Sequence, residues 1–329
     1  MKKTQEKAFL DCIRSFPLQF WKAVELGFLW KAPESLWKKN ISGVIIAGMG
    51  GSGIGGLIAK DLLENKAIVP IIVVQDYSIP KFADNNWLAI IVSYSGNTEE
   101  TLSVFYEAKK RGMAIVCISS NGILSKECKN CILIPPGFAP RTQLCMTFAP
   151  IIATLEKMGL VFAGSSLEKT ASFLESISEE AEEDGKKIAK FLHKKIPVIY
   201  SQKRFGSAAL RFHTQLAENS KTFSHWNVLP ELNHNEIVGF LPCEEKLAFV
   251  LFRDEKENTR ERKRMDFTKK IISEKSQWLE LWPKGKSDME KMFYFILAGD
   301  FASYYLALLN GVDPEKVENI EMLKRELKK

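Results

Sequence analysis

The stretch GVIIAGMGGSGIGG, residues 43–56, decides the fold class of this chain. It begins as a short apolar strand over residues 43–47, continues into a glycine-rich loop over 48–56, and enters a helix that we predict from Gly55 to Leu63. Uninterrupted apolar strands that alternate with helices are typical of a parallel sheet that helices cover on both faces. The pattern continues along the chain and predicts an α/β protein with three layers, helix–sheet–helix.

The second half of the chain repeats this pattern. PVIYSQKRFGSAAL, residues 197–210, aligns in order with the opening stretch, and LAFVLFRDEKENTRE, 247–261, aligns with LAIIVSYSGNTEETL, 88–102. An internal repeat of this kind predicts two copies of one architectural unit, so we predict two subdomains, each a parallel sheet flanked by helices. The expected parts are an N-terminal helical segment over 1–40, a first subdomain over 41–150, a helical linker over 151–195 and a second subdomain over 196–329.

The apolar runs and the helix signals give the expected elements. The strands outside the opening stretch are 69–74, 88–93, 114–118, 131–134, 198–200, 247–252 and 278–282. The helices include 98–111 starting from Asn97, 207–219, 258–272, 291–309, and 314–327 opened by Asp313 and Pro314. The nearly apolar run 292–309 has the length of a membrane span, but Asp300 at mid-bilayer would cost about 2.5 kcal/mol or more. We therefore expect a buried core helix there.

Length and composition exclude several classes of protein. The 329 residues predict two domains or one large one, and 46% hydrophobic with 26% charged residues excludes wholesale disorder and a fibrous repeat. The net charge of +6 is spread along the chain and does not indicate a nucleic-acid partner. Residues 1–20 lack an apolar core, so we expect no signal peptide, and the six cysteines are expected as reduced thiols in the cytoplasm.

The glycine-rich loop 48–56 joins a strand to a helix, where the backbone can approach a ligand and the helix N-terminus offers unpaired N–H groups. Its spacing, Gly48-x-Gly50-x-x-Gly53, also fits the dinucleotide fingerprint, and Asp76 would then be the acid that binds the ribose. Asp76 lies 28 residues after Gly48, later than the usual spacing of about 20. This loop alone leaves both a dinucleotide and a phosphomonoester open as ligands.

A second loop, SYSGNTEET over residues 93–101, favours the phosphomonoester. Ser93, Ser95 and Thr98 bring three hydroxyl groups within six residues at another junction of a strand with a helix. Hydroxyl and backbone N–H groups donate to phosphate oxygens and form the compact site that a sugar phosphate needs. Ser52 of the first loop is expected at the same point, because neighbouring parallel strands end at one edge of the sheet. Helix capping would explain one such loop, whereas two at one edge indicate phosphate binding.

Several motifs resemble those of one known family. GMGGSGIGG and SYSGNTEET are similar to motifs of the bifunctional phosphoglucose/phosphomannose isomerases of archaea and bacteria, which belong to the sugar isomerase (SIS) superfamily. The other similar motifs are the Pro140-Arg141 pair, AENSKT (217–222), PELNHNEIVGF (230–240) and GVDPEKVENIEMLK (311–324). The resemblance covers residues 41–327. It implies two SIS subdomains, a hexose 6-phosphate substrate, a homodimer with its active site at the interface, no cofactor and no metal, and neither nucleic acid nor membrane as a partner.

The resemblance also assigns site residues. An aldose–ketose isomerase needs a carboxylate base beside C1 and C2, a group that opens the sugar ring, and a cation or donor for the developing oxyanion. By resemblance, Glu218 is the base and His234, expected from the other subunit, opens the ring. Lys324 assists at the ring oxygen, and Arg141 lies near the enediolate. The residues that the resemblance assigns to the phosphate are Gly51, Ser52, Ser93, Ser95 and Thr98.

Some alternatives stay open on the sequence. A non-catalytic sugar-phosphate sensor would also carry SIS domains, although residues 1–40 are too short and too mixed in charge for the helix-turn-helix module of a transcriptional regulator. An NAD(P)-dependent oxidoreductase would use the GxGxxG pattern. Glu231 and Glu236 flank the histidine as other candidate bases, but the spacing favours Glu218. The single CxxC pair, Cys128 and Cys131, falls short of the four ligands of a structural zinc site.

Overall fold

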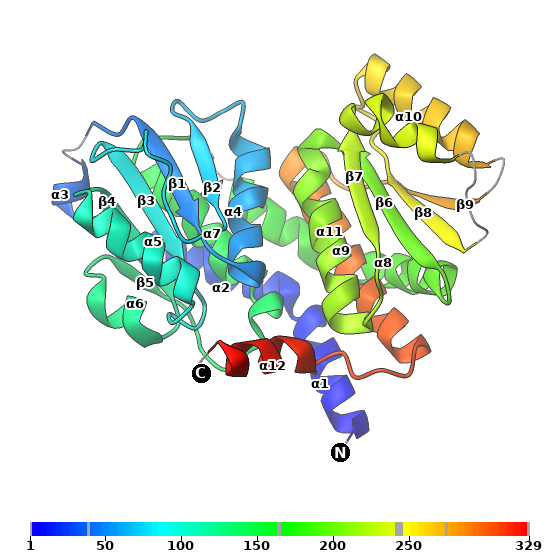
Figure 1. Ribbon diagram of the computed structural model, residues 1–329, viewed down its shortest axis with the longest axis horizontal. Helices are drawn as coiled ribbons and strands as arrows, with labels where there is room; N and C mark the ends of the chain where they lie inside the picture. The colour runs from blue at the N-terminus through cyan, green and yellow to red at the C-terminus, as the bar shows by residue number, and fades with distance from the viewer. Residues whose placement is uncertain (1, 38–39, 163–165, 241–245, 274–275, 328–329) are drawn as a thin grey trace. The chain divides into compact units, whose positions relative to one another are not determined.

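The computed structural model describes residues 2–37, 40–162, 166–240, 246–273 and 276–327. The chain forms two compact units. The N-terminal unit is Ser15–Glu175, and the C-terminal unit combines Met1–Arg14 with Ser176–Lys329. Figure 1 shows that each unit is built around one sheet with helices beside it. The borders that the sequence suggests at residues 40, 150 and 195 stay predictions.

The N-terminal unit contains a five-stranded parallel sheet, sheet A, with the strand order β2-β1-β3-β4-β5. Its strands are β1 Gly43–Ala47, β2 Ile71–Val74, β3 Trp87–Val92, β4 Ala114–Ser119 and β5 Cys131–Leu133. β1 and β3 are neighbours, with Val44 beside Leu88 and Ala47 beside Ile91, and every residue of both strands is buried. A strand that is covered on both faces must be apolar throughout, which explains why the uninterrupted apolar runs predicted these two strands.

Helices enclose sheet A. They are α2 Phe16–Leu29, α3 Glu34–Trp37, α4 Gly50–Leu63, α5 Glu99–Lys110, α6 Gly122–Glu127 and α7 Leu144–Lys157, and the 3-10 turn η1 is Pro140–Thr142. α2 packs closely on α7, because a Cβ atom added to Gly27 would lie only 2.7 Å from the Cβ of Ala153. The rings of Phe20 and Phe148 lie 6.2 Å apart in the same contact. The second helix of the chain is therefore part of the core of this unit.

The C-terminal unit contains a four-stranded parallel sheet, sheet B, with the strand order β7-β6-β8-β9. Its strands are β6 Ile196–Gln202, β7 His225–Leu229, β8 Leu247–Phe252 and β9 Gln277–Leu281. Its helices are α1 Lys2–Arg14, α8 Ser166–Leu192 from Ser176 onward, α9 Gly206–Ser220, α10 Thr259–Ser273, α11 Asp288–Leu309 and α12 Glu318–Glu326, and its 3-10 turns are η2 Lys203–Phe205, η3 Glu231–His234 and η4 Glu236–Phe240. The order of the four strands matches β2-β1-β3-β4 of sheet A, so the predicted architectural repeat is confirmed.

α11 is the apolar segment that has the length of a membrane span. Among the described residues it is the one helix that passes this test of length and composition, and 83% of its apolar stretch is buried inside the structure. Its Asp300 accepts a hydrogen bond from Arg211 of α9, with 2.6 Å between Oδ2 and Nη2, and another from Gln215 at 3.1 Å. The predicted core helix is confirmed, and a buried arginine neutralises the charge within it.

Some details of the predicted elements were wrong. The helix predicted from Gly55 begins at Gly50, so most of the predicted glycine-rich loop 48–56 forms the first turns of α4. The sequence predicted no strand over 225–229, where the structure has β7. The last helix begins at Glu318 and not at Pro314, because Asp313 Oδ1 accepts a hydrogen bond from the backbone N–H of Glu315 at 2.9 Å and the chain turns there first. The N-cap of α5 is Thr98, because the side chain of Asn97 instead accepts a hydrogen bond from the N–H of Ile123 at 3.0 Å.

Candidate active site

The two predicted phosphate loops meet at the C-terminal edge of sheet A. β1 and β3 are hydrogen-bonded neighbours, so the loops that follow them emerge side by side. The backbone N–H of Tyr94 donates to Ser52 Oγ at 3.1 Å and joins the two loops directly. A Cβ atom on Gly48 would lie 2.8 Å from the carbonyl oxygen of Val92, so only glycine permits this approach. The predicted convergence of the two loops is therefore found in the structure.

The hydroxyl groups of the second loop form one cluster. Ser93 Oγ and Thr98 Oγ1 are 2.9 Å apart, and Ser93 Oγ also accepts a hydrogen bond from the N–H of Gly96 at 3.1 Å. Ser95 Oγ accepts from the N–H of Asn97 at 3.3 Å. Ser93 is buried whereas Ser95 is exposed. Ser95 can therefore reach a ligand from solvent, while Ser93 holds the loop in shape.

Two glycines set the backbone of these loops. Gly50 and Gly96 have φ angles of +49° and +67°, a region that side chains with a Cβ rarely adopt. At Gly96 a Cβ atom would lie 1.8 Å from the carbonyl oxygen of Asn121, whereas at Gly50 no atom lies within 4 Å of the added Cβ. The second loop is therefore packed against its neighbour, and the tip of the first loop is open.

Arg141 lies beside the first loop. It belongs to η1, and a Cβ atom on Gly51 would come within 2.9 Å of the carbonyl oxygen of Pro140 and 3.0 Å of the Cα of Arg141. Arg141 is 5% exposed. A buried guanidinium group and the N-termini of α4 and α5 thus share one edge of sheet A, an arrangement that favours an anion. This edge brings together six predicted site residues: Gly51, Ser52, Ser93, Ser95, Thr98 and Arg141.

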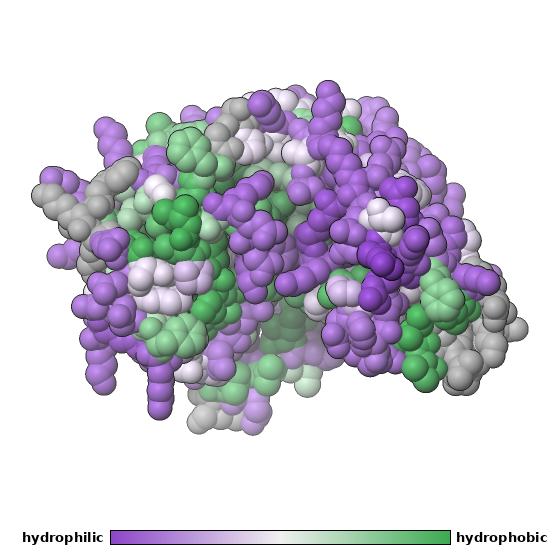
Figure 2. All heavy atoms as spheres, turned by 90° about the horizontal axis from the view of Figure 1, so that it is seen from above, coloured by the Kyte–Doolittle hydropathy of each residue, from purple (hydrophilic) through white to green (hydrophobic). Residues whose placement is uncertain are grey.

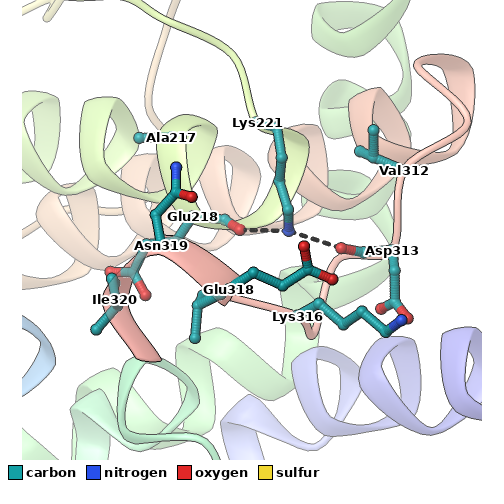
Figure 3. Close-up of a pocket in the computed structure, with 10 residues that line it drawn as sticks. Ala217, Glu218, Lys221, Val312, Asp313, Lys316, Glu318, Asn319 and Ile320 are labelled. Atoms are coloured by element: carbon teal, nitrogen blue, oxygen red, sulfur yellow. Dashed lines mark hydrogen bonds between the residues drawn. The ribbon is translucent and has the colours of Figure 1, made fainter. Parts of the chain in front are cut away.

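Glu218 lies in the C-terminal unit, at a cavity of ≈ 470 Å³ between the end of α9 and the segment 312–320 (Figure 3). α9 ends at Lys221, whose φ angle is +53°. The Nζ of Lys221 donates to the carbonyl oxygens of Glu218 at 2.8 Å and of Asp313 at 2.6 Å. These bonds provide a donor for a carbonyl oxygen at the C-terminal end of α9 and hold the wall of the cavity in place. The same cavity is lined by Lys316 and Glu318.

His234 is not among the described residues that line this cavity. α9 follows β6 and runs back along sheet B, so Glu218 near its end lies at the edge where the strands begin. His234 ends η3, just after β7, and therefore lies at the edge where the strands end. The five residues of β7 span roughly 13 Å at about 3.3 Å per residue. In Figure 1, the lower end of α9 lies near α12, whereas α10 lies near the upper end of β7. One chain therefore holds Glu218 and His234 apart.

Lys324 is exposed on α12. It lies four residues beyond Ile320, which lines the Glu218 cavity, so the two share one face of the helix. Lys324 itself is not among the described residues that line the cavity.

The segment that carries His234 is fixed by Glu236. The carboxylate of Glu236 accepts hydrogen bonds from Tyr200 Oη and Asn227 Nδ2, and His225 Nε2 lies 2.8 Å from its Oε1. The other flanking acid, Glu231, accepts from Asn235 Nδ2 at 2.9 Å. Both acids thus shape the loop. The anchoring role of Glu236 was missed on the sequence, and no signal there could have shown it, because its partners come from β6 and β7.

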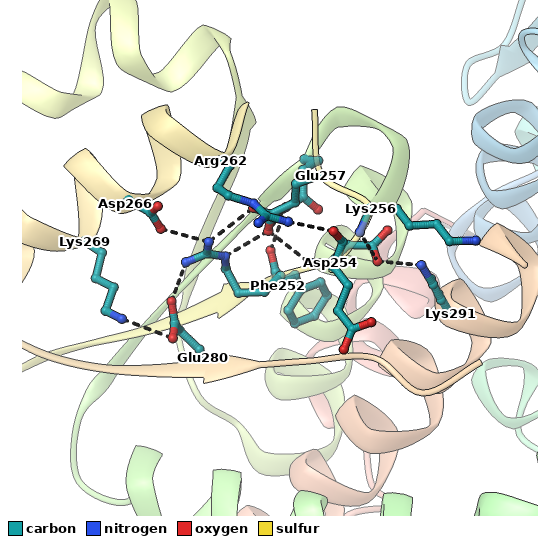
Figure 4. Close-up of polar contacts among 12 residues, drawn as sticks. Phe252, Asp254, Lys256, Glu257, Arg262, Asp266, Lys269, Glu280 and Lys291 are labelled. Carbon is teal, nitrogen blue, oxygen red and sulfur yellow. Dashed lines mark hydrogen bonds and ion pairs between the residues drawn. The ribbon is translucent and has the colours of Figure 1, made fainter. Parts of the chain in front are cut away.

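The matching edge of sheet B carries an ionic network and not a hydroxyl cluster (Figure 4). Arg253 follows β8 and is 3% exposed. Its Nε lies 2.8 Å from Glu257 Oε1, its Nη2 lies 2.8 Å from Asp266 Oδ1, and its Nη1 pairs with Glu280. Burial alone would lower the pKa of Arg253, but Glu257 and the other carboxylates raise it above its usual value. The guanidinium group is therefore enclosed by acids of the same unit.

Asp254 extends this network. Its carboxylate pairs with Lys291 of α11 and with Arg204 of η2, and it accepts from the N–H of Lys256 at 3.1 Å. Burial alone would raise the pKa of Asp254, but the hydrogen bond from Lys291 and the neighbouring charges lower it below its usual value. The charged groups at this edge therefore satisfy one another.

No metal centre forms at the cysteines that the structure describes. The described residues contain no group of three or more His, Cys, Asp or Glu side chains that could hold a metal ion. Cys117 is buried and Cys131 lies beside it on the neighbouring strand. Burial raises the pKa of the Cys117 thiol, and it raises the pKa of Cys131 to about 12. Both thiols are therefore poor nucleophiles and contribute to packing.

Known protein families match both halves of the chain. The family described as "SIS domain" matches residues 36–157, and "Bacterial phospho-glucose isomerase C-terminal SIS domain" matches 181–327. The bifunctional phosphoglucose/phosphomannose isomerase of Aquifex aeolicus is 39% identical, over 87% of this chain and 91% of that protein. The protein of the same name from Caldicellulosiruptor bescii is 34% identical, over 96% and 98%.

A solved structure supports the fold. The C-terminal domain of glucosamine-fructose-6-phosphate aminotransferase from Francisella tularensis has a TM-score of 0.75 at 16% identity, covering 94% of this chain and 98% of that one. At this identity the likeness concerns the fold alone. The family follows from the two sequence relatives, which are 39% and 34% identical over most of this chain: the chain belongs to the bifunctional phosphoglucose/phosphomannose isomerase family.

Proposed function

We propose that this chain is an aldose–ketose isomerase that interconverts glucose 6-phosphate, and also mannose 6-phosphate, with fructose 6-phosphate. Family membership over nearly the whole chain supports the reaction class. The observation that carries the proposal is the edge of sheet A, where the exposed Ser95 and the buried Arg141 accompany two helix N-termini. Such an edge suits a doubly charged phosphate ester.

The phosphate would bind between the two loops. Gly51 and Ser52 would donate from the first loop, and Ser95 and Thr98 from the second. Ser93 would contribute through its contact with Thr98. Arg141 would stabilise the negative charge that develops on the enediolate oxygen.

The chemistry then needs only acid–base groups. His234, assisted by Lys324, would transfer a proton to the ring oxygen and open the pyranose. Glu218 would take the proton from C2 to give a cis-enediol and return it at C1, so that aldose becomes ketose with no net gain or loss of protons. No electron transfer occurs, so the reaction needs no redox cofactor. A cytoplasmic location fits the free thiols of Cys12, Cys117, Cys128, Cys131 and Cys145.

We also propose that His234 acts in the active site of a second copy, within a homodimer. The support is the separation described above, since Glu218 and His234 lie at opposite edges of sheet B in one chain. A strand of roughly 13 Å is too long for both groups to reach one hexose ring from the same chain.

The test of the reaction is a coupled assay of fructose 6-phosphate formation from both hexose phosphates, with added EDTA as the metal control. Glu218→Gln should lower kcat by about 10²–10⁴-fold, the usual contribution of a general base, while fructose 6-phosphate still binds. The matched control is Glu318→Gln, which changes another carboxylate at the same cavity and should leave kcat within about twofold. A Glu218→Gln enzyme with ordinary turnover would refute the assignment. Binding without any turnover in the unaltered protein would favour a sugar-phosphate sensor.

The shared site has its own test. Glu218→Gln and His234→Ala proteins should each be inactive. If they are mixed, unfolded and refolded together, mixed dimers form that hold one site with both original residues. Activity should then return to roughly a quarter of the unaltered level, because half of the dimers are mixed and each has one intact site. No recovery would show that the histidine acts within its own chain.

A further inference from the structure

A second cavity of ≈ 410 Å³ lies in the C-terminal unit, between α10 and the turns η3 and η4. Its described lining residues are Asn233, Ile237, Arg260, Lys263, Arg264 and Phe267. The volume falls in the range of small-molecule sites, about 300–1,000 Å³. In Figure 2, hydrophilic side chains predominate on the right, the side on which Figure 1 places α10. Three cations around one hollow point to an anionic ligand.

The cations of α10 divide into two groups. Arg262 donates from Nη2 to the carbonyl oxygen of Glu255 at 2.6 Å, and Lys269 Nζ lies 3.1 Å from Glu280 Oε2. These two cations point away from the cavity toward partners of the ionic network. By contrast, the side chains of Arg260, Lys263 and Arg264 have neither a hydrogen bond nor an ion pair in the described part of the chain.

The placement of these three cations opposes the stability of the helix. Lys263 and Arg264 lie three and four positions after Arg260, so each shares a face of α10 with Arg260 and repels it. Arg260 also lies in the first turn, where the positive end of the helix dipole disfavours a cation. Glu261 is the acid of that turn, but it does not line the cavity. An unneutralised cluster that conflicts with local preference is expected where a ligand completes it.

The rest of the lining adds a polar acceptor and apolar surface. The Nδ2 of Asn233 donates to Thr268 Oγ1 at 2.8 Å, whereas its Oδ1 is buried without a hydrogen-bond partner in the described residues. The ring of Phe267 is 57% exposed beside the cations, and Ile237 contributes further apolar surface. An exposed aromatic ring offers a face on which a flat group can stack.

We propose that this cavity binds a nucleoside polyphosphate, with the phosphates on Arg260, Lys263 and Arg264, and the base on Phe267. Three cations match the charge of two or more phosphates. One guanidinium group can donate two parallel hydrogen bonds to the oxygens of a phosphate. The three cations belong to α10, whereas the loops that suit the hexose phosphate belong to sheet A, so different groups would bind the phosphates of the two ligands.

The test is calorimetric titration of the full-length protein with ADP, pyrophosphate and adenosine, so that binding is measured without turnover. ADP should bind more tightly than pyrophosphate, and adenosine most weakly. The double variant Lys263→Glu/Arg264→Glu should weaken ADP at least about tenfold. Lys270→Glu is the matched control, because Lys270 is exposed on the same helix, unpaired among the described residues and outside the cavity lining; its effect should stay within about threefold.

Further arms separate the parts of the ligand. Phe267→Ala should weaken ADP by about threefold or more and leave pyrophosphate unchanged. Circular dichroism of each variant checks that α10 remains folded. Equal affinity for ADP and pyrophosphate would overturn the nucleoside part of the proposal. Absent binding, binding that is insensitive to the charge reversal, or displacement of ADP by fructose 6-phosphate would overturn the site.

Discussion

The C-terminal edges of sheets A and B have the same strand order but opposite chemistry. After β3 of sheet A the chain carries small hydroxyl residues, and their donors are turned toward one another and toward solvent. After β8 of sheet B it carries Arg253 and Asp254, which are buried among partners of opposite charge. One architecture thus supports the proposed anion site at one edge and a self-neutralised ionic network at the other.

The difference shows which features of a sheet edge favour ligand binding. Parallel strands and helix N-termini are common to both edges. Only the edge of sheet A combines close backbone approach at glycine with an exposed hydroxyl such as Ser95. At the edge of sheet B the side chains fill the space and satisfy their charges internally. We therefore expect changes at the first edge to affect ligand binding and changes at the second to affect folding.

The largest expected effect is on the network of sheet B. Arg253→Met would leave the fully buried carboxylate of Glu257 without its nearest cation, whereas Glu280 keeps Lys269 at 3.1 Å; breaking a buried pair in this way costs about 3–5 kcal/mol. The free energy of unfolding, measured in urea, should fall by that amount, while KM stays unchanged. The control Arg262→Met, which alters a half-exposed cation, should cost less than about 1 kcal/mol. A raised KM without loss of stability would contradict the assigned role of the network.

Low pH should lower the stability of the C-terminal unit through the pair Arg14–Glu182. In the C-terminal unit the Arg14 guanidinium holds the pKa of Glu182 at about 2, with further help from Tyr305. Because this folded-state pKa lies below the usual value of about 4.5, the stabilisation is present above pH 4.5 and is lost as the pH falls toward 2. Glu182→Gln should remove about 2–3 kcal/mol at pH 7 and flatten the decline in acid.

The matched control for this acid effect is Glu183→Gln. Glu183 pairs with Lys186 at 2.6 Å on the surface of α8 and should contribute less than about 1 kcal/mol. Denaturant titrations at pH 7, 5, 4 and 3 would measure both variants. Equal acid profiles for Glu182→Gln and the unaltered protein would disprove the role of this pair.

At the edge of sheet A we expect an effect on binding. Ser95→Ala removes an exposed donor, and a hydrogen bond to a charged group contributes about 1.5–3 kcal/mol, so KM for the hexose phosphate should rise about 10- to 100-fold. Stability should stay within about 0.5 kcal/mol. The control is Ser103→Ala. Ser103 lies further along α5, and its hydroxyl donates a hydrogen bond to the carbonyl oxygen of Tyr77, so this substitution should leave KM unchanged. A KM that rises equally in both variants would speak against a site at the loop.

The two glycines of the loops compare a closely packed backbone position with an open one. Gly96→Ala combines a positive φ with a Cβ only 1.8 Å from the Asn121 carbonyl oxygen, so it should cost about 2–3 kcal/mol and disturb binding. Gly50→Ala meets only the unfavourable φ in open space and should cost about 1 kcal/mol. Thermal unfolding of both variants measures which substitution lowers stability more. If the second loop could shift freely, Gly50→Ala would be the more costly of the two.

The buried strands were predictable from the sequence because both of their faces are covered. β1 and β3 read as apolar runs, whereas β7 contains His225 and Asn227 and was missed. β7 is a half-exposed edge strand, so its residues need not be apolar. Pro314 suggested an early start for the last helix, but the Asp313 turn intervenes. Local signals thus identify covered elements better than edges and termini.

The candidate site was predictable in part. The hydroxyl loops follow from the residue types alone, because strand ends meet at one edge. The spacing of Glu218 and His234 could not show that α9 and β7 carry them to opposite edges. Nor could the sequence show which cations of α10 are paired, because Arg262 and Arg264 are the same residue type and differ in what the fold places beside them. Contacts between distant segments decide these points.

The separation of Glu218 and His234 has a further consequence for how the enzyme responds to its own concentration. If each histidine acts in the active site of the neighbouring copy, a single chain contains no complete active site. Diluting the protein should then extinguish turnover while the secondary structure persists, and specific activity becomes a direct measure of association between copies.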